Sequence, residues 1–307
     1  MALNLIEAAK RYANPVQQAI VEMFPENSDI LMALPFETIS GNAMSYNREE
    51  TLPGVGFRGV NEAFTESTGV VNPIIEPLVI AGGDLDVDKF IVETMGEDQR
   101  SVQESMKVKA LAHRWTETFI KGDNATEPRE FDGLQTRLTG SQKIVAGATA
   151  NGTPLSLAKL DELIDNVDAP THLIMNKTMR RLLTAAARST SVGGYVTYDQ
   201  DAFGRRLTYY NDLPILIADQ DETGAEILPF TEVASSGTAT ATSIYCVSFT
   251  EGRLTGIQSS PPDVRDLGEL ETKPAYRTRV EWYNGIAIYT ARAAARLWSI
   301  SNAAVTA

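Results

Sequence analysis

The chain has 307 residues, a mass of 33.4 kDa and an ordinary globular composition, with 43% apolar and 22% charged residues. Its length allows one large or two medium domains with their own cores. The net charge of −13 argues against a nucleic-acid-binding protein, because binding a duplex requires Lys and Arg to neutralise its phosphates. The single cysteine, Cys246, excludes an internal disulfide framework and fits a reducing compartment. No apolar run is long enough to cross a membrane, and Glu7 interrupts any secretory signal core.

Residues 1–34 are predicted to form an arm. Leu5–Lys10 and Val16–Phe24 have helical apolar spacing, and prolines interrupt the chain at positions 15 and 25. These pieces are too short to fold alone, so we expect them to lie on another surface.

The next stretch, about 36–82, is predicted to leave the body as a two-stranded excursion. Phe36–Tyr46 and Asn72–Ile80 have strand character, although two prolines confine the second to a sheet edge. Between them lies a polar segment with four glycines and no helical pattern. A loop of this length is unusual in a compact domain unless it is functional. An isolated hairpin is marginal in water, so we expect a neighbouring chain to stabilise it.

A long helix follows this excursion. The pattern predicts a short helix over Asp86–Thr94 and a second over about 97–121, almost 40 Å long at roughly 1.5 Å per residue. The core face of the second helix is predicted to comprise Val108, Leu111, Trp115 and Phe119, with Ala112 on the same stripe.

Three local signals accompany this helix. Glu117 and Lys121 have the spacing of a stabilising ion pair, and Thr94 and Glu97 have the spacing of a capping box. Gly122 follows the last apolar residue and is predicted to end the helix in the left-handed conformation.

The remainder, after a polar connection at 123–151, alternates helical and strand patterns. Helices are predicted over about 156–167, from Asn176 to about 188, and over 291–300. Strands are predicted at 172–175, 213–218 and 243–249, with a hairpin over 276–290 that turns at Asn284-Gly285. Loops are predicted at 189–205 and 231–242. The alternation favours an α/β or α+β domain with a central sheet.

The chain has no enzyme signature. Gly54, Gly56 and Gly59 match a G-x-G-x-x-G spacing, but no strand precedes them and no helix follows, so they are interpreted as loop glycines. His113 and His172 lack metal-ligand spacing, and Cys246 has the surroundings of a small buried hydrophobe. We therefore predict no catalytic residue, no cofactor and no metal.

The order of these parts resembles the HK97-fold major capsid proteins of tailed double-stranded DNA bacteriophages. The resemblance rests on FIKGD closing the long helix with FDGL soon after, PTHLIMNKTMRRLL, YNDLPILIAD and RTRVEWYNGIAIYTARAAARLWSI. It covers nearly the whole chain. It implies an α+β HK97-like fold with an N-terminal arm, an extended E-loop hairpin, a long spine helix, and peripheral and axial domains.

The resemblance also implies boundaries. The arm would span 1–34 and the E-loop 35–80; the peripheral domain would combine 81–150 with 271–307, and the axial domain would span 151–270. Pentamers and hexamers would form an icosahedral shell around phage DNA, through a procapsid that expands. Such a chain would assemble in the host cytoplasm and reside in the virion.

Two departures from the family pattern shape the expected partners. Some relatives cross-link an E-loop lysine to a neighbour, but no lysine lies between Phe36 and Lys89. We therefore expect a non-covalent shell, with a decoration protein as a possible partner. No helical scaffolding segment precedes the arm, so a separate scaffolding protein is expected, together with a portal. The DNA would be enclosed without sequence-specific binding, and no membrane would be involved.

The excursion supplies the candidate contacts between subunits. Phe57 and Phe64 are the expected apolar anchors. The expected polar partners are Arg48, Glu49, Glu50, Arg58 and Glu62, each of which could equally be a solvated surface charge. Two other functions stay open: an encapsulin-type cargo shell with the same fold, and a cytosolic α/β enzyme with an unmarked carboxylate site.

Overall fold

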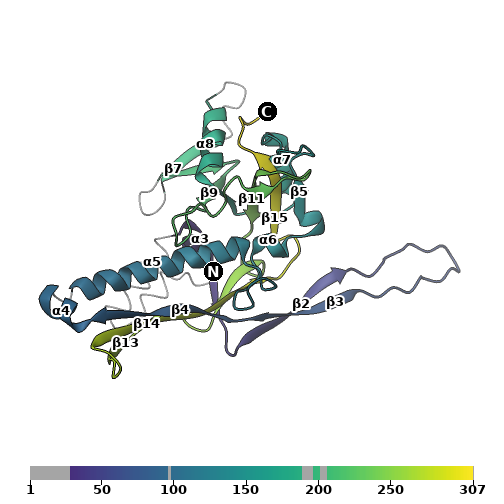
Figure 1. Cartoon of the computed structure of the whole chain (residues 1–307). Coiled ribbons are helices and arrows are strands. Elements are labelled where there is room, and N and C mark those ends of the chain that lie inside the picture. Colours follow the sequence, from purple (N-terminus) through teal and green to yellow (C-terminus); the bar gives the residue numbers. More distant parts are fainter. Residues whose placement is uncertain (1–27, 96–97, 189–195, 201–205, 307) are drawn as a thin grey trace.

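The computed structural model describes residues 28–95, 98–188, 196–200 and 206–306 (Figure 1). Helices and strands are mixed, which confirms the predicted α+β class. Figure 1 shows a lower body, in which a long helix lies along a sheet, an upper body around a second sheet, and a thin projection. The predicted helices of the arm, at 5–10 and 16–24, lie outside the described residues.

The lower body is built on a five-stranded sheet whose central strand is β14 (Ala275–Ile288). β14 pairs antiparallel with β4 (Val79–Asp88), with β12 (Leu254–Gln258) and with β13 (Asp263–Glu269), and β1 (Phe36–Thr38) joins β12 in parallel. Helices α4 (Lys89–Met95) and α5 (Asp98–Lys121) follow β4, and α5 runs back across the sheet.

The upper body is built on an eight-stranded sheet with the order β5-β15-β11-β6-β9-β8-β7, to which β10 adds by pairing with β11. Its strands are β5 (Lys143–Val145), β6 (His172–Met175), β7 (Val196–Gln200), β8 (Arg206–Tyr210), β9 (Leu213–Ile217), β10 (Glu232–Val233), β11 (Ala239–Val247) and β15 (Ala294–Ser301). The shorter helices are α3 (Asp29–Ala33), α6 (Leu134–Arg137), the 3-10 turn Gly140–Gln142, α7 (Leu157–Asp165) and α8 (Lys177–Ala186).

The eight-stranded sheet is buried on both faces. Ile174 packs into one core with α3, α5 and β14, whereas its neighbours Leu173 and Met175 pack into a second core with α7 and α8. Successive side chains of a strand point to opposite faces, so one four-residue apolar strand serves both cores. This explains why HLIM reads as an uninterrupted apolar run.

Several local predictions are confirmed. The strands at 172–175 and 213–217 and the helix at 157–165 form as expected. The Asn176 side chain caps α8 by accepting a hydrogen bond from the Met179 amide. The predicted excursion is a hairpin of β2 (Ala43–Thr51) and β3 (Val70–Pro77), which pair with each other and with no other described strand.

The predicted hairpin over 276–290 is wrong. β14 continues through Asn284-Gly285, which is paired to Val79 on one side and to β12 on the other. The buried Asn284 side chain accepts a hydrogen bond from the Trp115 indole and donates one to the Trp282 carbonyl. Tertiary partners therefore satisfy the groups that would otherwise favour a turn.

The predicted helix over 291–300 is also wrong, because residues 294–301 form β15 between β11 and β5. The run AAARLWSI is apolar enough for either structure, and burial between two strands decides it. The loops predicted at 189–205 and 231–242 contain β7, β10 and the start of β11. The short helix starts at Lys89 and not at Asp86, because Asp86 belongs to β4, where its carboxylate accepts a hydrogen bond from Arg277.

Other details around the long helix differ from expectation. Gly122 does not adopt a left-handed conformation; it is needed for space, because a Cβ would lie 2.3 Å from the Phe131 carbonyl oxygen. Glu117 pairs with Arg114 (2.9 Å), three residues earlier. The capping box with Thr94 involves position 97, outside the described residues.

Sheet pairing crosses the expected domain boundaries. Strand β15 and the short β5, placed by sequence in the peripheral ranges, lie in the upper sheet. β12 and β13, placed in the axial range, lie in the lower sheet. Residues 30–34, expected in the arm, are part of the chain's own core: Ile30, Leu31 and Leu34 are fully buried.

Candidate assembly surfaces

The spine helix α5 is locked to the lower sheet by an aromatic cluster. The four residues expected on its core face are all buried: Val108, Leu111, Trp115 and Phe119 are 1%, 9%, 2% and 0% exposed. The Trp115 ring lies 5.2 Å from the Phe119 ring and 5.8 Å from that of Trp282 in β14. The indole of Trp282 donates to the Gln258 side chain (3.1 Å). Helix and sheet therefore form one rigid platform.

The hairpin is fixed to this platform at its base by a buried polar cluster. Arg137 donates two hydrogen bonds to the Glu76 carboxylate, at 2.5 and 2.8 Å. The Tyr46 hydroxyl contacts Glu76 (3.3 Å) and donates to the Ile288 carbonyl (2.9 Å). Burial raises the pKa of Tyr46 to about 12, and the Glu76 charge adds to the shift. The Tyr46 ring also lies 4.8 Å from the ring of Tyr289.

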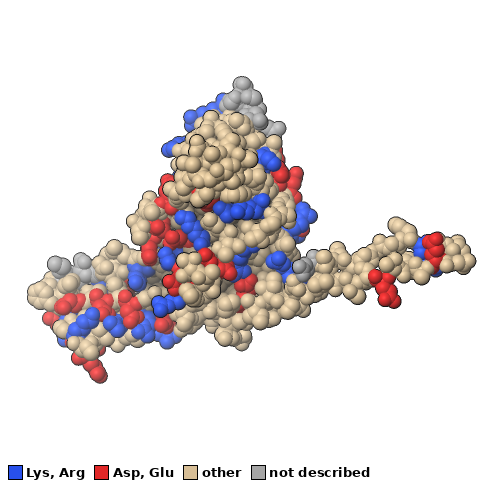
Figure 2. All heavy atoms as spheres, turned by 45° about the vertical axis from the view of Figure 1, so that its right-hand side comes forward, with Lys and Arg blue, Asp and Glu red and all other residues tan. Residues whose placement is uncertain are grey.

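Beyond β2 and β3, residues 52–69 form a projection that we call the finger. All of its residues are exposed, and it extends away from both bodies (Figure 1). Its apolar side chains are exposed to an unusual degree: Leu52 78%, Val55 95%, Phe57 107%, Val60 93% and Phe64 64%. Figure 2 shows few charged side chains along it. A folded monomer gains nothing from holding these apolar groups in water.

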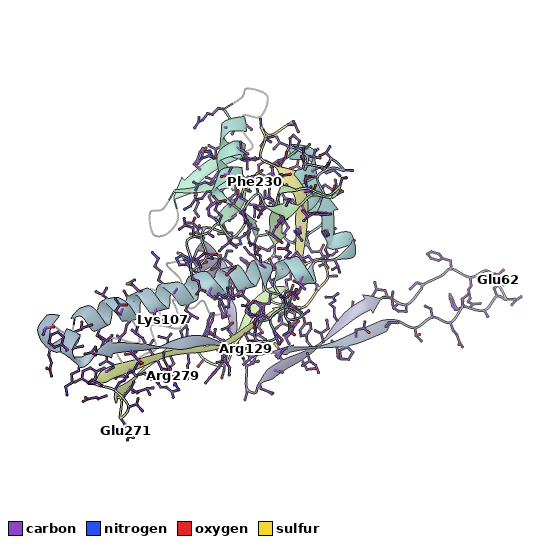
Figure 3. The ribbon with its side chains drawn as sticks, viewed as in Figure 1. Glu62, Lys107, Arg129, Phe230, Glu271 and Arg279 are labelled. Carbon is purple, nitrogen blue, oxygen red and sulfur yellow. The ribbon has the colours of Figure 1, made fainter. Side chains whose placement is uncertain are left out.

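The finger tip has internal order. The Glu62 carboxylate accepts a hydrogen bond from the Gly59 amide (2.8 Å), and Asn61 adopts the left-handed conformation of a turn residue. The Arg58 guanidinium lies 5.2 Å from the centre of the Phe64 ring and donates to the Glu62 carbonyl. Figure 3 shows Glu62 at the far end of the projection. The tip is thus a shaped surface without a partner among the described residues of its own chain.

The other candidate contact residues are divided between the finger and its root. The structure places Phe57, Arg58, Glu62 and Phe64 in the finger, and Arg48 and Glu49 in β2. The side chain of Glu50 lies outside what the structure describes. Arg48 is half-buried, whereas Glu49 is exposed.

The structure adds a charged surface that sequence reasoning missed. On the face of β4 and β14 opposite α5, Arg279 donates to Asp84 at 2.7 Å and Arg277 donates to Asp86 at 2.6 Å. Lys273 adds a further contact to Asp86. These cations hold the pKa of both carboxyl groups below their usual range, chiefly through the arginine hydrogen bonds. Figure 2 shows the mixed charges on this part of the molecule. The alternation of charged and apolar side chains along β14 was visible in the sequence, but its pairing with β4 was not.

The single cysteine and the two histidines are the remaining candidates for reactive groups. Burial raises the pKa of the Cys246 thiol to about 12 and lowers the pKa of His172 to about 4, which leaves both uncharged at neutral pH. His113 is half-buried on α5. The described residues contain no group of three metal-ligating side chains and no helix able to cross a membrane.

Known proteins share this architecture. A family model for major capsid protein GP7 matches residues 13–158. The capsid of a native GTA particle superposes with a TM-score of 0.63 at 17% identity, covering 90% of this chain and 91% of that one. A chain of Mycobacterium phage Bobi superposes with a TM-score of 0.60 at 11% identity, covering 88% and 89%. The chain therefore has the HK97-like capsid fold, and the match to the capsid family model lies in its first half.

The same capsid fold also occurs outside phages. The holo-SrpI encapsulin complex of Synechococcus elongatus PCC 7942 matches this chain with a TM-score of 0.63 at 18% identity, covering 89% of this chain and 88% of that one. No curated protein matches the sequence. The family model and the capsid structures give no support to the α/β-enzyme hypothesis.

Proposed function

We propose that this chain assembles as pentamers and hexamers into an icosahedral shell that encloses phage double-stranded DNA. The observation that supports this most directly is the finger, whose five large apolar side chains are exposed in the single chain. Surfaces of this kind mark contacts between proteins. A closed shell repeats each such contact in every subunit, so individually modest contacts add up.

In this proposal the regions have separate tasks. The arm (1–34) and the E-loop (35–80) reach neighbouring subunits, with residues 30–34 held in the subunit's own core. The peripheral domain (81–150 and 271–307) carries the spine helix. The axial domain (151–270) points toward the five- and six-fold axes. The exchange of β12, β13 and β15 between the sheets ties these two domains together.

Phe57 and Phe64 act as the anchors of the finger, and Arg48, Glu49, Glu50, Arg58 and Glu62 form the polar rim of the contact. Removing the Phe57 ring should reduce shell yield while leaving the subunit folded, because that ring is fully exposed within the chain. The measurement is the yield of particles from the expressed full chain, by gradient sedimentation and negative-stain microscopy. Phe90→Ala in α4 is the matched control, since Phe90 is also exposed (71%). Equal yields for Phe57→Ala and the wild type would contradict the role of the finger.

The shell is held non-covalently, because no lysine lies between Phe36 and Lys89 to form an E-loop cross-link. Assembly uses a separate scaffolding protein, a portal and a decoration protein, and passes through a procapsid that expands as DNA enters. The net charge of −13 suits a wall along which DNA slides without sequence-specific binding. Boiled mature particles should release 33.4 kDa monomers. A ladder of covalent multimers would overturn this part of the proposal.

A second candidate function is a cargo compartment, favoured by the likeness in fold to an encapsulin complex. The contents of purified particles separate the two functions. Nuclease-protected DNA supports the phage capsid, whereas a folded enzyme inside DNA-free particles supports the compartment.

A further inference from the structure

A basic groove lies beside helix α8 in the upper body. It has a volume of about 660 Å³ and is bordered by α8 and by Tyr198 and Thr208 of strands β7 and β8. Lys177, Arg180, Arg181 and Arg188 line it, and no Asp or Glu is among its lining residues. This is an unusual concentration of positive charge on a chain with a net charge of −13.

The arginines of this groove lack partners within the described part of the chain. Lys177 pairs with Asp219, with Nζ and Oδ2 2.5 Å apart. The side chains of Arg180, Arg181 and Arg188 form no ion pair with any described residue. Cations on successive turns of one helix repel one another, so the cluster costs stability in the free subunit. An acidic surface brought to the groove would remove that cost.

The chain carries such a surface on α7. Asp161, Glu162 and Asp165 are all exposed on this helix, and its one cation, Lys159, pairs with Glu162 at 2.6 Å. Helix α7 packs on β15, and its Asp161 accepts a hydrogen bond from the Tyr210 hydroxyl at the end of β8 (2.8 Å). The groove is bordered instead by α8 and by Tyr198 and Thr208. Figure 1 shows α8 and α7 on opposite flanks of the upper body.

We propose that the α8 groove of one subunit receives the acidic face of α7 from the next subunit around a capsomere. Rings are closed by head-to-tail contacts, in which one flank of a subunit meets the opposite flank of its neighbour. The two flanks here are complementary in charge, which fixes the register of neighbours and disfavours wrong pairings. A second copy fits better than nucleic acid, since the acidic chain as a whole repels phosphates. This inference rests on the proposed assembly into rings.

A charge swap tests the contact. We expect Arg181→Glu alone and Asp165→Arg alone each to lower the yield of capsomeres and shells about tenfold or more, because like charges then face each other. The double variant should regain most of the wild-type yield, since it restores one opposite pair. Arg129→Glu is the matched control: Arg129 is exposed in a loop beside α5, away from α8 (Figure 3).

The outcomes separate the inference from the assembly proposal. A wild-type chain that forms no rings or shells would overturn both. Wild-type shells with normal yields from either single variant would overturn only the inference, as would a double variant that does not recover. Shells of normal yield that retain less DNA in Arg181→Glu would place nucleic acid in the groove and also overturn it. Unchanged thermal unfolding of the variant subunits shows that their folding is intact.

Discussion

The spine-helix platform and the finger contain similar apolar side chains in opposite situations. Trp115, Phe119 and Trp282 are at most 2% exposed, and the Trp115 ring contacts the other two rings, whereas Phe57 is as exposed as a free side chain. The platform therefore contributes to the stability of the single chain. The finger, in contrast, contributes only when another molecule covers it. The comparison separates the residues that fold the subunit from those proposed to join subunits.

The largest effect should come from the platform. Trp115→Ala removes a buried ring, and large-to-small changes of this kind cost roughly 3–5 kcal/mol of unfolding free energy. Phe57→Ala should change the unfolding free energy of the isolated subunit by less than about 0.5 kcal/mol, as for exposed sites. Denaturant unfolding of both variants checks the contrast. A large destabilisation by Phe57→Ala would mean that the finger folds onto its own body.

The next effect concerns the joint between the two regions. Arg137→Ala leaves the largely buried Glu76 carboxylate without its cation. Removing one partner of a fully buried ion pair usually lowers the unfolding free energy by roughly 3–5 kcal/mol. We expect faster amide hydrogen exchange in β2 and β3, which among the described strands pair with no other partner. Glu76→Gln with Arg137→Gln, which removes both charges, should cost less. Unchanged exchange in β2 and β3 would show that the joint does not hold the hairpin.

A smaller effect is expected at Gly82, where β4 lies against β14. A Cβ there would lie 2.1 Å from the Val280 carbonyl oxygen, and the residue has a φ of +155°. Gly82→Ala should therefore destabilise the platform by about 1–3 kcal/mol, the usual range for strained backbone positions. Gly56→Ala in the finger is the control, because nothing lies within 4 Å of its added Cβ. Equal melting temperatures for the two variants would contradict this close approach.

The smallest effect is a pH dependence of the platform. The folded-state pKa values of Asp84 and Asp86 lie below their ordinary values, so their stabilisation is present above pH 3.8 and is lost as the pH falls further. Both pairs are in partial contact with solvent, so salt should weaken the effect. Urea midpoints at pH 5 and pH 3 should differ less in an Asp84→Asn/Asp86→Asn variant than in the wild type. If the variant and the wild type showed the same pH dependence, these ion pairs would not contribute to the pH dependence of stability.

The candidate surfaces were predictable in part. The hairpin, the stripe of α5 and the capping Asn176 follow from periodicity and local chemistry, which act over a few residues. The ladder of Asp84 and Asp86 with Arg277 and Arg279 was not predictable, since the partners are almost 200 residues apart. The basic groove likewise requires α8 to meet β7 and β8 in space.

The sequence by itself determined that the chain is globular, which stripe of α5 is buried, and that the stretch after residue 36 lacks enough apolar neighbours to form a core. These are consequences of local pattern and composition. Only the tertiary structure decided that Asn284-Gly285 continues a strand and that residues 294–301 form β15. In both places the local preference is weak or opposed, and pairing with distant strands satisfies the backbone better than a turn or a helix would.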